Sequence, residues 1–124
     1  EAVAWVKHPT QPDHPSHELV KTMLPKGAGS IIVFGLKGGR NAGKAFIEAV
    51  ELSSHLANVG DAKTLVIHPA STTHSHISAE AMLEGGLSDD MIRLSVGLED
   101  IADITADFEI GFRAAARVAA KAAE

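Results

Sequence analysis

The chain alternates short apolar segments of strand type with longer segments of helical type, and this alternation limits the possible folds more than any other feature. The clearest strand-type segment, Ser30 to Leu36, is apolar, β-branched and followed by a glycine-rich turn, as expected for a largely buried strand. Thr64 to Ile67, Met91 to Val96 and the shorter Val3 to Val6 have similar character. Because a helical pattern follows each of them, we expect a two-layer α/β sandwich with about four strands.

Four helices are predicted between and after these strands. Ser16 can cap a first, short helix, and Asn41 can cap a second whose apolar stripe extends to about Ala57. A third helix is expected from about Ser78 to Glu84, and a long C-terminal helix from about Glu99. The apolar stripe of the last helix comprises Ile101, Ile104, Phe108, Phe112, Ala115 and Ala119. Strict alternation by itself favours a parallel sheet, although sequence does not settle strand direction.

Length and charge restrict the classes of function. A chain of 124 residues is sufficient for one domain, so residues 1–124 are predicted to form a single unit. Its formal charge is −5 and it has no basic block, which argues against nucleic acid or an anionic membrane as the main partner. There is no cysteine, no signal-peptide pattern and no apolar run long enough to span a bilayer, so we expect a cytoplasmic protein. The chain begins at Glu1 without an initiator Met, which suggests a piece of a longer protein.

Arg93 is the most informative single residue. Its strand alternates, so that Ile92 and Leu94 point to one face and Arg93 to the other, away from the expected core. A guanidinium in that position can hold a carboxylate through two parallel hydrogen bonds. Alternation alone, however, favours a solvated or salt-bridged surface arginine.

Other candidate sites are weaker. His68, His74 and His76 could ligate zinc, but they lack a matched second pair of ligands, and polar loop histidines are the default interpretation. Gly35 to Gly39 could cradle a phosphate, but this segment matches no phosphate-binding motif, so a turn into a helix is favoured. Ser71 and His74 are neighbours without a nucleophile-elbow motif, which argues against a hydrolase.

Two ordered motifs resemble a known family. Residues Asn58 to His74, followed at the expected separation by Ile92 to Asp100, are similar to signatures of the Cys/Met-metabolism family of pyridoxal-phosphate enzymes. Within it, Leu24 to Gly29 and Gly35 to Gly39 look most like the O-acetylhomoserine sulfhydrylases. The resemblance covers nearly the whole chain but corresponds only to the C-terminal domain of such an enzyme.

The resemblance implies a fold, a cofactor and a reaction. The fold is a small, mostly antiparallel sheet with helices on one side, which replaces the parallel default. The cofactor is pyridoxal phosphate on a lysine of a separate large domain, since no lysine here has that context; Lys37 and Lys63 belong to the glycine turn and to the start of a strand. The reaction is γ-replacement, in which O-acetylhomoserine and sulfide give homocysteine and acetate. A homotetramer is also implied for the complete enzyme.

The same resemblance implies a substrate site without catalytic, cofactor-binding or metal-binding residues in this chain. Arg93 corresponds to the arginine that grips the substrate α-carboxylate. Asn58 and Val59 correspond to the pocket-lining pair, where many relatives carry Ser-Leu, so a contact through the Asn58 backbone is expected to persist. Thr73 corresponds to a hydroxyl residue near the carboxylate clamp.

Two alternatives remain open. One is another activity of the same family: cystathionine γ-synthase, cystathionine γ-lyase or methionine γ-lyase. The other is a non-catalytic α/β module that binds a small anion or a protein partner through the Arg93 face.

Overall fold

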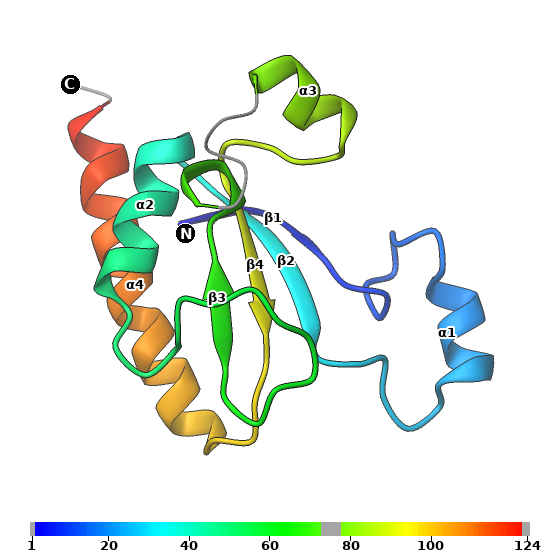
Figure 1. Ribbon diagram of the computed structural model, residues 1–124. Helices are drawn as coiled ribbons and strands as arrows, with labels where there is room; N and C mark the ends of the chain where they lie inside the picture. The colour runs from blue at the N-terminus through cyan, green and yellow to red at the C-terminus, as the bar shows by residue number, and fades with distance from the viewer. Residues whose placement is uncertain (1, 73–77, 123–124) are drawn as a thin grey trace.

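The computed structural model, which describes residues 2–72 and 78–122, contains a four-stranded sheet (Figure 1). Its strands are β1 (Val3–Lys7), β2 (Ile31–Leu36), β3 (Leu65–Ile67) and β4 (Met91–Ser95). They lie in the order β1-β2-β4-β3, and every neighbouring pair is antiparallel. The antiparallel sheet implied by the resemblance is therefore confirmed, and the parallel sheet favoured by alternation is wrong.

The order of the strands explains why alternation wrongly favoured a parallel sheet. Both β2 and β3 are antiparallel to β4, so they run parallel to each other, as a strand–helix–strand unit predicts. The last strand, β4, lies between them and pairs with both. Local pattern cannot reveal such an insertion, because it depends on a segment that comes later in the chain.

Helices α2 (Gly39–Ala49) and α4 (Ile101–Lys121) lie side by side on one face of the sheet, which we call the helix face (Figure 1). The short α3 (Ala79–Glu84) lies at one end of the sheet, and η1 (Pro69–Ser71) is a single 3₁₀ turn. Helix α1 (His17–Met23) lies at the right of the view in Figure 1, on the opposite side of the molecule from α2 and α4, and has no buried residue. None of the helices in residues 2–72 and 78–122 is long and apolar enough to cross a membrane.

The core lies between the helix face and the two helices. All four phenylalanines meet there, with ring centroids separated by 5.1 Å for Phe46 and Phe112 and by 5.7 Å for Phe34 and Phe46. Gly111 makes this approach possible, because a Cβ at that position would lie 2.7 Å from two ring carbons of Phe46. The rest of the buried cluster comprises Leu36, Ala42, Ile47, Val50, Val66, Ile92, Leu94 and Ala115.

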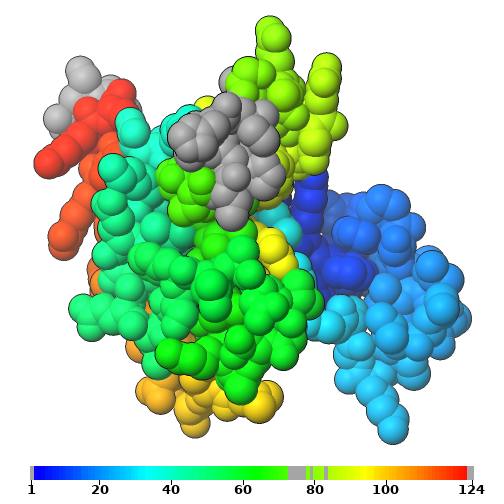
Figure 2. Space-filling view, viewed as in Figure 1, coloured from blue at the N-terminus to red at the C-terminus, as the bar shows by residue number. Residues whose placement is uncertain are grey.

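Two helix boundaries differ from the sequence-based expectation. Helix α2 begins after Gly38, whose φ of 98° makes the turn, so Asn41 lies inside the helix and does not cap it. The helix ends at Ala49, well before the predicted end near Ala57. Residues 51–64 are instead irregular, and Ser54 pairs with Leu65 at the β3 edge of the sheet. In the space-filling view this segment, in green, forms much of the front surface (Figure 2).

The ends of α1 and α4 correct two smaller expectations. Ser16 occupies the N-cap position of α1, but its side chain makes no capping hydrogen bond. In α4 the side chain of Asp100 accepts a hydrogen bond from the backbone N of Ala102 at 2.8 Å, as an N-cap should. Ile101 is not part of the buried stripe, since 70% of its surface is exposed.

Candidate functional site

Strand β4 places Arg93 on the face opposite the helices, as alternation predicts. Its neighbours Ile92 and Leu94 are buried on the helix face, whereas Arg93 is half-buried. The register pairs Arg93 with Val33 on β2 and with Ile67 on β3, so its side chain emerges between two apolar ones. We call the surface around Val33, Ile67 and Arg93 the Arg93 face.

The structure brings Arg93 and Asn58 together from 35 residues apart. The Nη2 atom of Arg93 donates a hydrogen bond to the backbone carbonyl oxygen of Asn58 at 3.2 Å. Val59 follows directly and is 63% exposed. Three of the four predicted substrate-binding residues thus belong to one surface, and Thr73 lies outside the described residues.

The Asn58 side chain is engaged within its own turn. Its Oδ1 accepts a hydrogen bond from the Val59 backbone N at 2.9 Å, and its Nδ2 donates to a carboxylate oxygen of Asp61 at 3.4 Å. The carbonyl group, not the amide side chain, is therefore the part of Asn58 that meets Arg93. A contact of this kind does not depend on which side chain stands at position 58.

The surroundings of Arg93 differ from those of a purely structural surface arginine, which often forms an ion pair. Within residues 2–72 and 78–122, no carboxylate lies within ion-pair distance of its guanidinium. By contrast, Arg113 pairs with Glu109 at 3.7 Å along α4. An arginine held by one carbonyl has several donors left for a planar anion such as a carboxylate.

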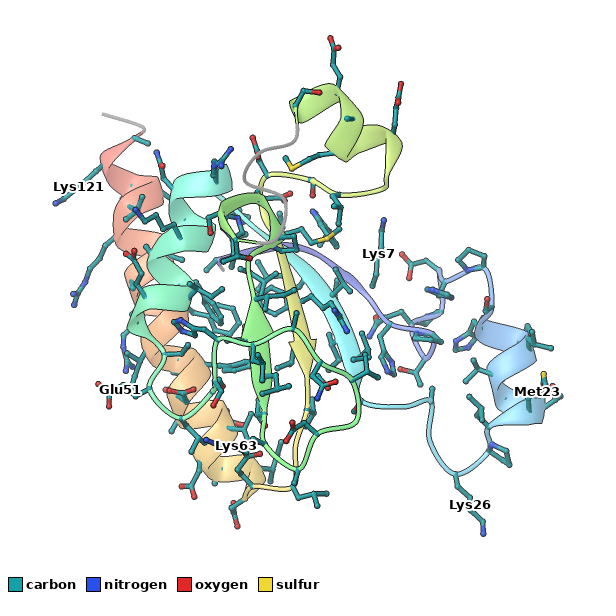
Figure 3. All side chains as sticks on the ribbon, viewed as in Figure 1. Lys7, Met23, Lys26, Glu51, Lys63 and Lys121 are labelled. Atoms are coloured by element: carbon teal, nitrogen blue, oxygen red, sulfur yellow. The ribbon has the colours of Figure 1, made fainter. Side chains whose placement is uncertain are left out.

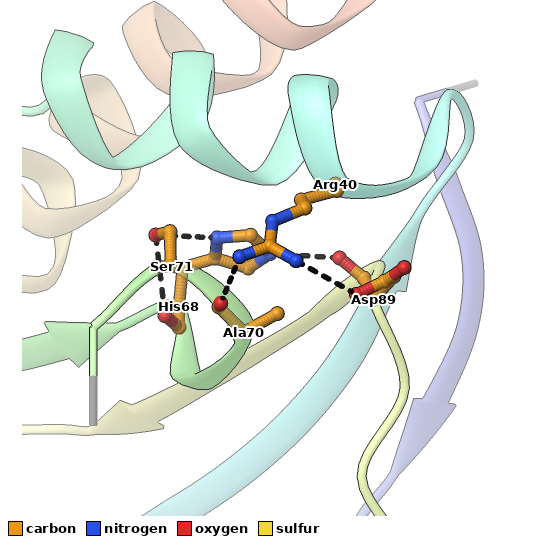
Figure 4. A network of polar contacts seen from close by, with 5 residues as sticks. All are labelled: Arg40, His68, Ala70, Ser71 and Asp89. Carbon is orange, nitrogen blue, oxygen red and sulfur yellow. Dashed lines mark hydrogen bonds and ion pairs between the residues drawn. The ribbon is translucent and has the colours of Figure 1, made fainter. Parts of the chain in front are cut away.

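A second polar network holds His68, which is fully buried (Figure 4). Its Nε2 lies 2.8 Å from the backbone carbonyl oxygen of Asp89, and its Nδ1 lies 2.8 Å from the hydroxyl of Ser71. Burial lowers the pKa of His68, so the neutral ring donates from Nε2 to that carbonyl and accepts from Ser71 at Nδ1. Gly43 allows the close packing, since a Cβ there would lie 2.5 Å from Nε2.

These contacts bear on the histidine hypothesis. Both ring nitrogens of His68 are used by protein atoms, which leaves no lone pair for a metal ion. Within the part of the chain that the structure describes, no three His, Asp or Glu side chains gather as a metal site would require. His74 and His76 lie outside that part.

Arg40 was not singled out from the sequence. Its Nη2 donates to the backbone carbonyl oxygen of Ala70 at 2.6 Å, and its Nη1 lies 3.8 Å from a carboxylate oxygen of Asp89 (Figure 4). It ties the start of α2 to η1 and to the turn before β4, so its role here is structural. The glycines before it form the turn into α2, with left-handed φ at Gly38 and Gly39, as predicted.

The lysine side chains lie at the surface of the structure. All seven are exposed, and Lys21 and Lys44 face Glu18 and Glu48 within their own helices. Figure 3 shows Lys26 and Lys121 directed away from the sheet.

Comparison with known proteins places the chain among sulfur-amino-acid enzymes. The family model "Cys/Met metabolism PLP-dependent enzyme" matches residues 1–113. O-acetyl-L-homoserine sulfhydrylase 1 of Thermus thermophilus is 50% identical over 107 residues, which is 86% of this chain and 25% of that protein. L-methionine gamma-lyase of Pseudomonas deceptionensis is 44% identical over 115 residues, which is 93% of this chain and 29% of that protein.

A solved structure agrees with this placement. Cystathionine gamma synthase from Xanthomonas oryzae pv. oryzae, in complex with cystathionine, superposes with a TM-score of 0.81 at 34% identity. The match covers 94% of this chain and 30% of that one. The chain thus spans about a quarter of the length of the curated relatives it matches.

Proposed function

The chain belongs to the family of Cys/Met-metabolism PLP-dependent enzymes, and from that premise we propose that it recognises the amino-acid substrate of an O-acetylhomoserine sulfhydrylase. The complete enzyme would convert O-acetylhomoserine and sulfide to homocysteine and acetate, a step of methionine biosynthesis. Relatives named O-acetyl-L-homoserine sulfhydrylase 1 and homocysteine synthase support this choice. The observation that carries the proposal is Arg93, a half-buried guanidinium whose one hydrogen bond in the described residues is to the Asn58 carbonyl.

In this proposal Arg93 binds the substrate α-carboxylate. Its guanidinium presents two parallel N–H groups, which match the two oxygens of a carboxylate and fix its plane. The apolar neighbours Val33 and Ile67 restrict the side chain and reduce competition from water. A carboxylate fixed in this way also sets the orientation of the α-carbon, which is the contribution of positioning to the rate.

The remaining site residues act beside this clamp. Asn58 and Val59 would form the adjacent wall of the substrate pocket, Asn58 through its backbone and Val59 through its exposed side chain. Thr73 is proposed as a further polar contact, from its match to the family motif. No catalytic residue is assigned to this chain.

Pyridoxal phosphate is the family's cofactor, and the family resemblance assigns its attachment to no lysine of this chain. We therefore propose that residues 1–124 act as a C-terminal domain together with a cofactor-binding domain outside them. On this proposal the chain alone is inactive. We further propose that the complete enzyme is a cytoplasmic homotetramer, which native mass spectrometry and cell fractionation would check.

Kinetics of the full-length enzyme test the carboxylate clamp. Arg93→Ala should raise KM for O-acetylhomoserine about 100-fold, because a hydrogen-bonded charge pair is lost. It should leave KM for sulfide and the cofactor absorption spectrum unchanged, and Arg93→Lys should restore part of the loss. Arg113→Ala, an exposed arginine on α4, is the matched control. An unchanged KM for O-acetylhomoserine in Arg93→Ala would refute the assignment.

A second candidate is another reaction of the same family. The relatives include an L-methionine gamma-lyase, and the superposed structure is a cystathionine gamma synthase; cystathionine γ-lyase is the third possibility. Supplying the full-length enzyme with sulfide, with cysteine or with no nucleophile separates these activities by product. We expect homocysteine from O-acetylhomoserine and sulfide; preferential formation of cystathionine, or cleavage without a nucleophile, would favour the alternatives.

A further inference from the structure

We propose that Glu99 and Asp107 are positioning residues: they anchor the two ends of residues 51–64 so that Asn58 and Val59 stay beside Arg93. We call residues 51–64 the substrate segment. The inference rests on the proposed function, because positioning has a purpose only if Arg93 and this segment bind substrate. Among the described residues neither carboxylate forms an ion pair with Arg93, so they would act through the segment.

Asp107 anchors the first end. Its side chain, on α4, is 5% exposed and accepts hydrogen bonds from the backbone N of Glu51 at 2.6 Å, of Leu52 at 3.0 Å and of Ser53 at 3.0 Å. The Ser53 hydroxyl donates a fourth at 2.8 Å. Burial alone would raise the pKa of Asp107, but these donors outweigh it and lower the pKa, so the group stays charged at neutral pH. The carboxylate thereby accepts hydrogen bonds from the backbone that directly follows α2.

Glu99 anchors the second end. It lies just before α4, and its two oxygens accept from the backbone N and from the hydroxyl of Thr64, each at 2.7 Å. The Thr64 hydroxyl in turn accepts from the backbone N of Gly97 at 2.9 Å, and Thr64 is fully buried. These two donors lower the pKa of Glu99. The last residue of the substrate segment is therefore fixed to the turn between β4 and α4.

Gly97 shows how closely this end is packed. A Cβ at position 97 would clash with a carboxylate oxygen of Glu99 and with the backbone of Lys63 and Thr64. The φ of Gly97 is not in the left-handed region, so close approach, not backbone conformation, explains the glycine. The backbone N of Leu98 adds a hydrogen bond to the carbonyl oxygen of Ala62 at 2.8 Å.

The middle of the substrate segment has far less support. Ser54 still pairs with the β3 edge, where its backbone N bonds the Thr64 carbonyl and its carbonyl accepts from Val66, both at 2.9 Å. Beyond it, Asn58 and Val59 are exposed, and within residues 2–72 and 78–122 Asn58 has one hydrogen bond to the sheet, the one from Arg93. The position of the predicted pocket wall relative to Arg93 therefore depends on the two anchored ends.

The full-length enzyme provides the test. Glu99→Ala should raise KM for O-acetylhomoserine about tenfold, or about 1.4 kcal/mol of binding, because the freed end of the substrate segment would no longer hold Asn58 and Val59 beside Arg93. It should leave kcat and KM for sulfide within about twofold, as expected when uniform binding is lost. Hydrogen–deuterium exchange should become faster in peptides that cover residues 55–63 and stay unchanged in α2. Glu109→Ala, an exposed glutamate on α4, is the matched control.

A pair of Thr64 variants covers the case in which Glu99→Ala fails to fold. Thr64→Val keeps the shape and removes the hydroxyl, so it should reproduce the change in KM and in exchange; Thr64→Ser keeps the hydroxyl and should resemble the unmodified enzyme. Unchanged exchange and unchanged KM in both Glu99→Ala and Thr64→Val would overturn the inference. If exchange in residues 55–63 accelerates but Arg93→Ala leaves KM unaltered, the anchoring is real and the proposed function is what fails.

Discussion

The two faces of the sheet are built on different principles. Between the helix face and helices α2 and α4, four phenylalanines and a continuous set of buried aliphatic side chains pack together. On the Arg93 face, one guanidinium meets one backbone carbonyl of a segment held at its ends by two carboxylates. Stability is therefore concentrated on the first face, because burial of apolar area dominates folding free energy. Substrate recognition is proposed for the Arg93 face, where few contacts restrict the exposed Asn58 and Val59.

The largest effect on stability is expected from the centre of the core between the helix face and the two helices. Phe46 is fully buried and contacts the other three phenylalanines. Phe46→Ala should lower the free energy of unfolding by about 3–5 kcal/mol, through lost burial and a residual cavity. Urea denaturation followed by circular dichroism would measure it. A loss below about 1 kcal/mol would break the comparison, because stability would then not depend on this face.

A smaller, pH-dependent effect on stability is expected at Asp107, which joins α4 to the start of the substrate segment. Asp107→Asn should cost about 1–3 kcal/mol at neutral pH, because the amide group cannot accept all four hydrogen bonds. The folded pKa of Asp107 is lowered, so its stabilisation is present above the unfolded value and is lost as the pH falls through the folded value.

The urea midpoints of Asp107→Asn and the unmodified protein should therefore converge as the pH falls below about 4. A constant difference between the two midpoints down to pH values well below that would contradict the assignment, since the carboxylate would then not be the source of the stability.

The smallest effect on stability is expected on the Arg93 face. Val59 is 63% exposed, so Val59→Ala should change the free energy of unfolding by no more than about 0.5 kcal/mol. In the full-length enzyme the same change should raise KM for O-acetylhomoserine by about tenfold, the low end of the value of one methylene contact in a pocket. A large loss of stability with an unchanged KM would reverse the roles given to the two faces.

The sequence predicted the helix face better than the Arg93 face, for a physical reason. Periodic burial of residues such as Phe108 and Phe112 leaves a repeating pattern, and alternation in β4 places Arg93 opposite the core. Local sequence does not predict the end of α2 at Ala49. The backbone N–H groups that follow this helix donate to Asp107, which lies more than 50 residues later in the chain. Nothing in its local sequence distinguishes this aspartate from an ordinary helix-surface acid.

The candidate site likewise depends on residues that local sequence patterns do not identify. Asn58 and Val59 were identified through family resemblance, since their exposed turn has no periodicity that could reveal them. Glu99 stands in an acidic helix start where dipole complementarity is a sufficient local explanation. Its contact with Thr64, 35 residues earlier, becomes visible only in the folded chain.

A crystal structure of the full-length enzyme with bound homoserine or O-acetylhomoserine would test the central claim most directly. We predict that both carboxylate oxygens lie about 2.7–2.9 Å from the guanidinium nitrogens of Arg93, with Asn58 and Val59 alongside. A carboxylate bound to another cation, with Arg93 still donating only to the Asn58 carbonyl, would contradict the account.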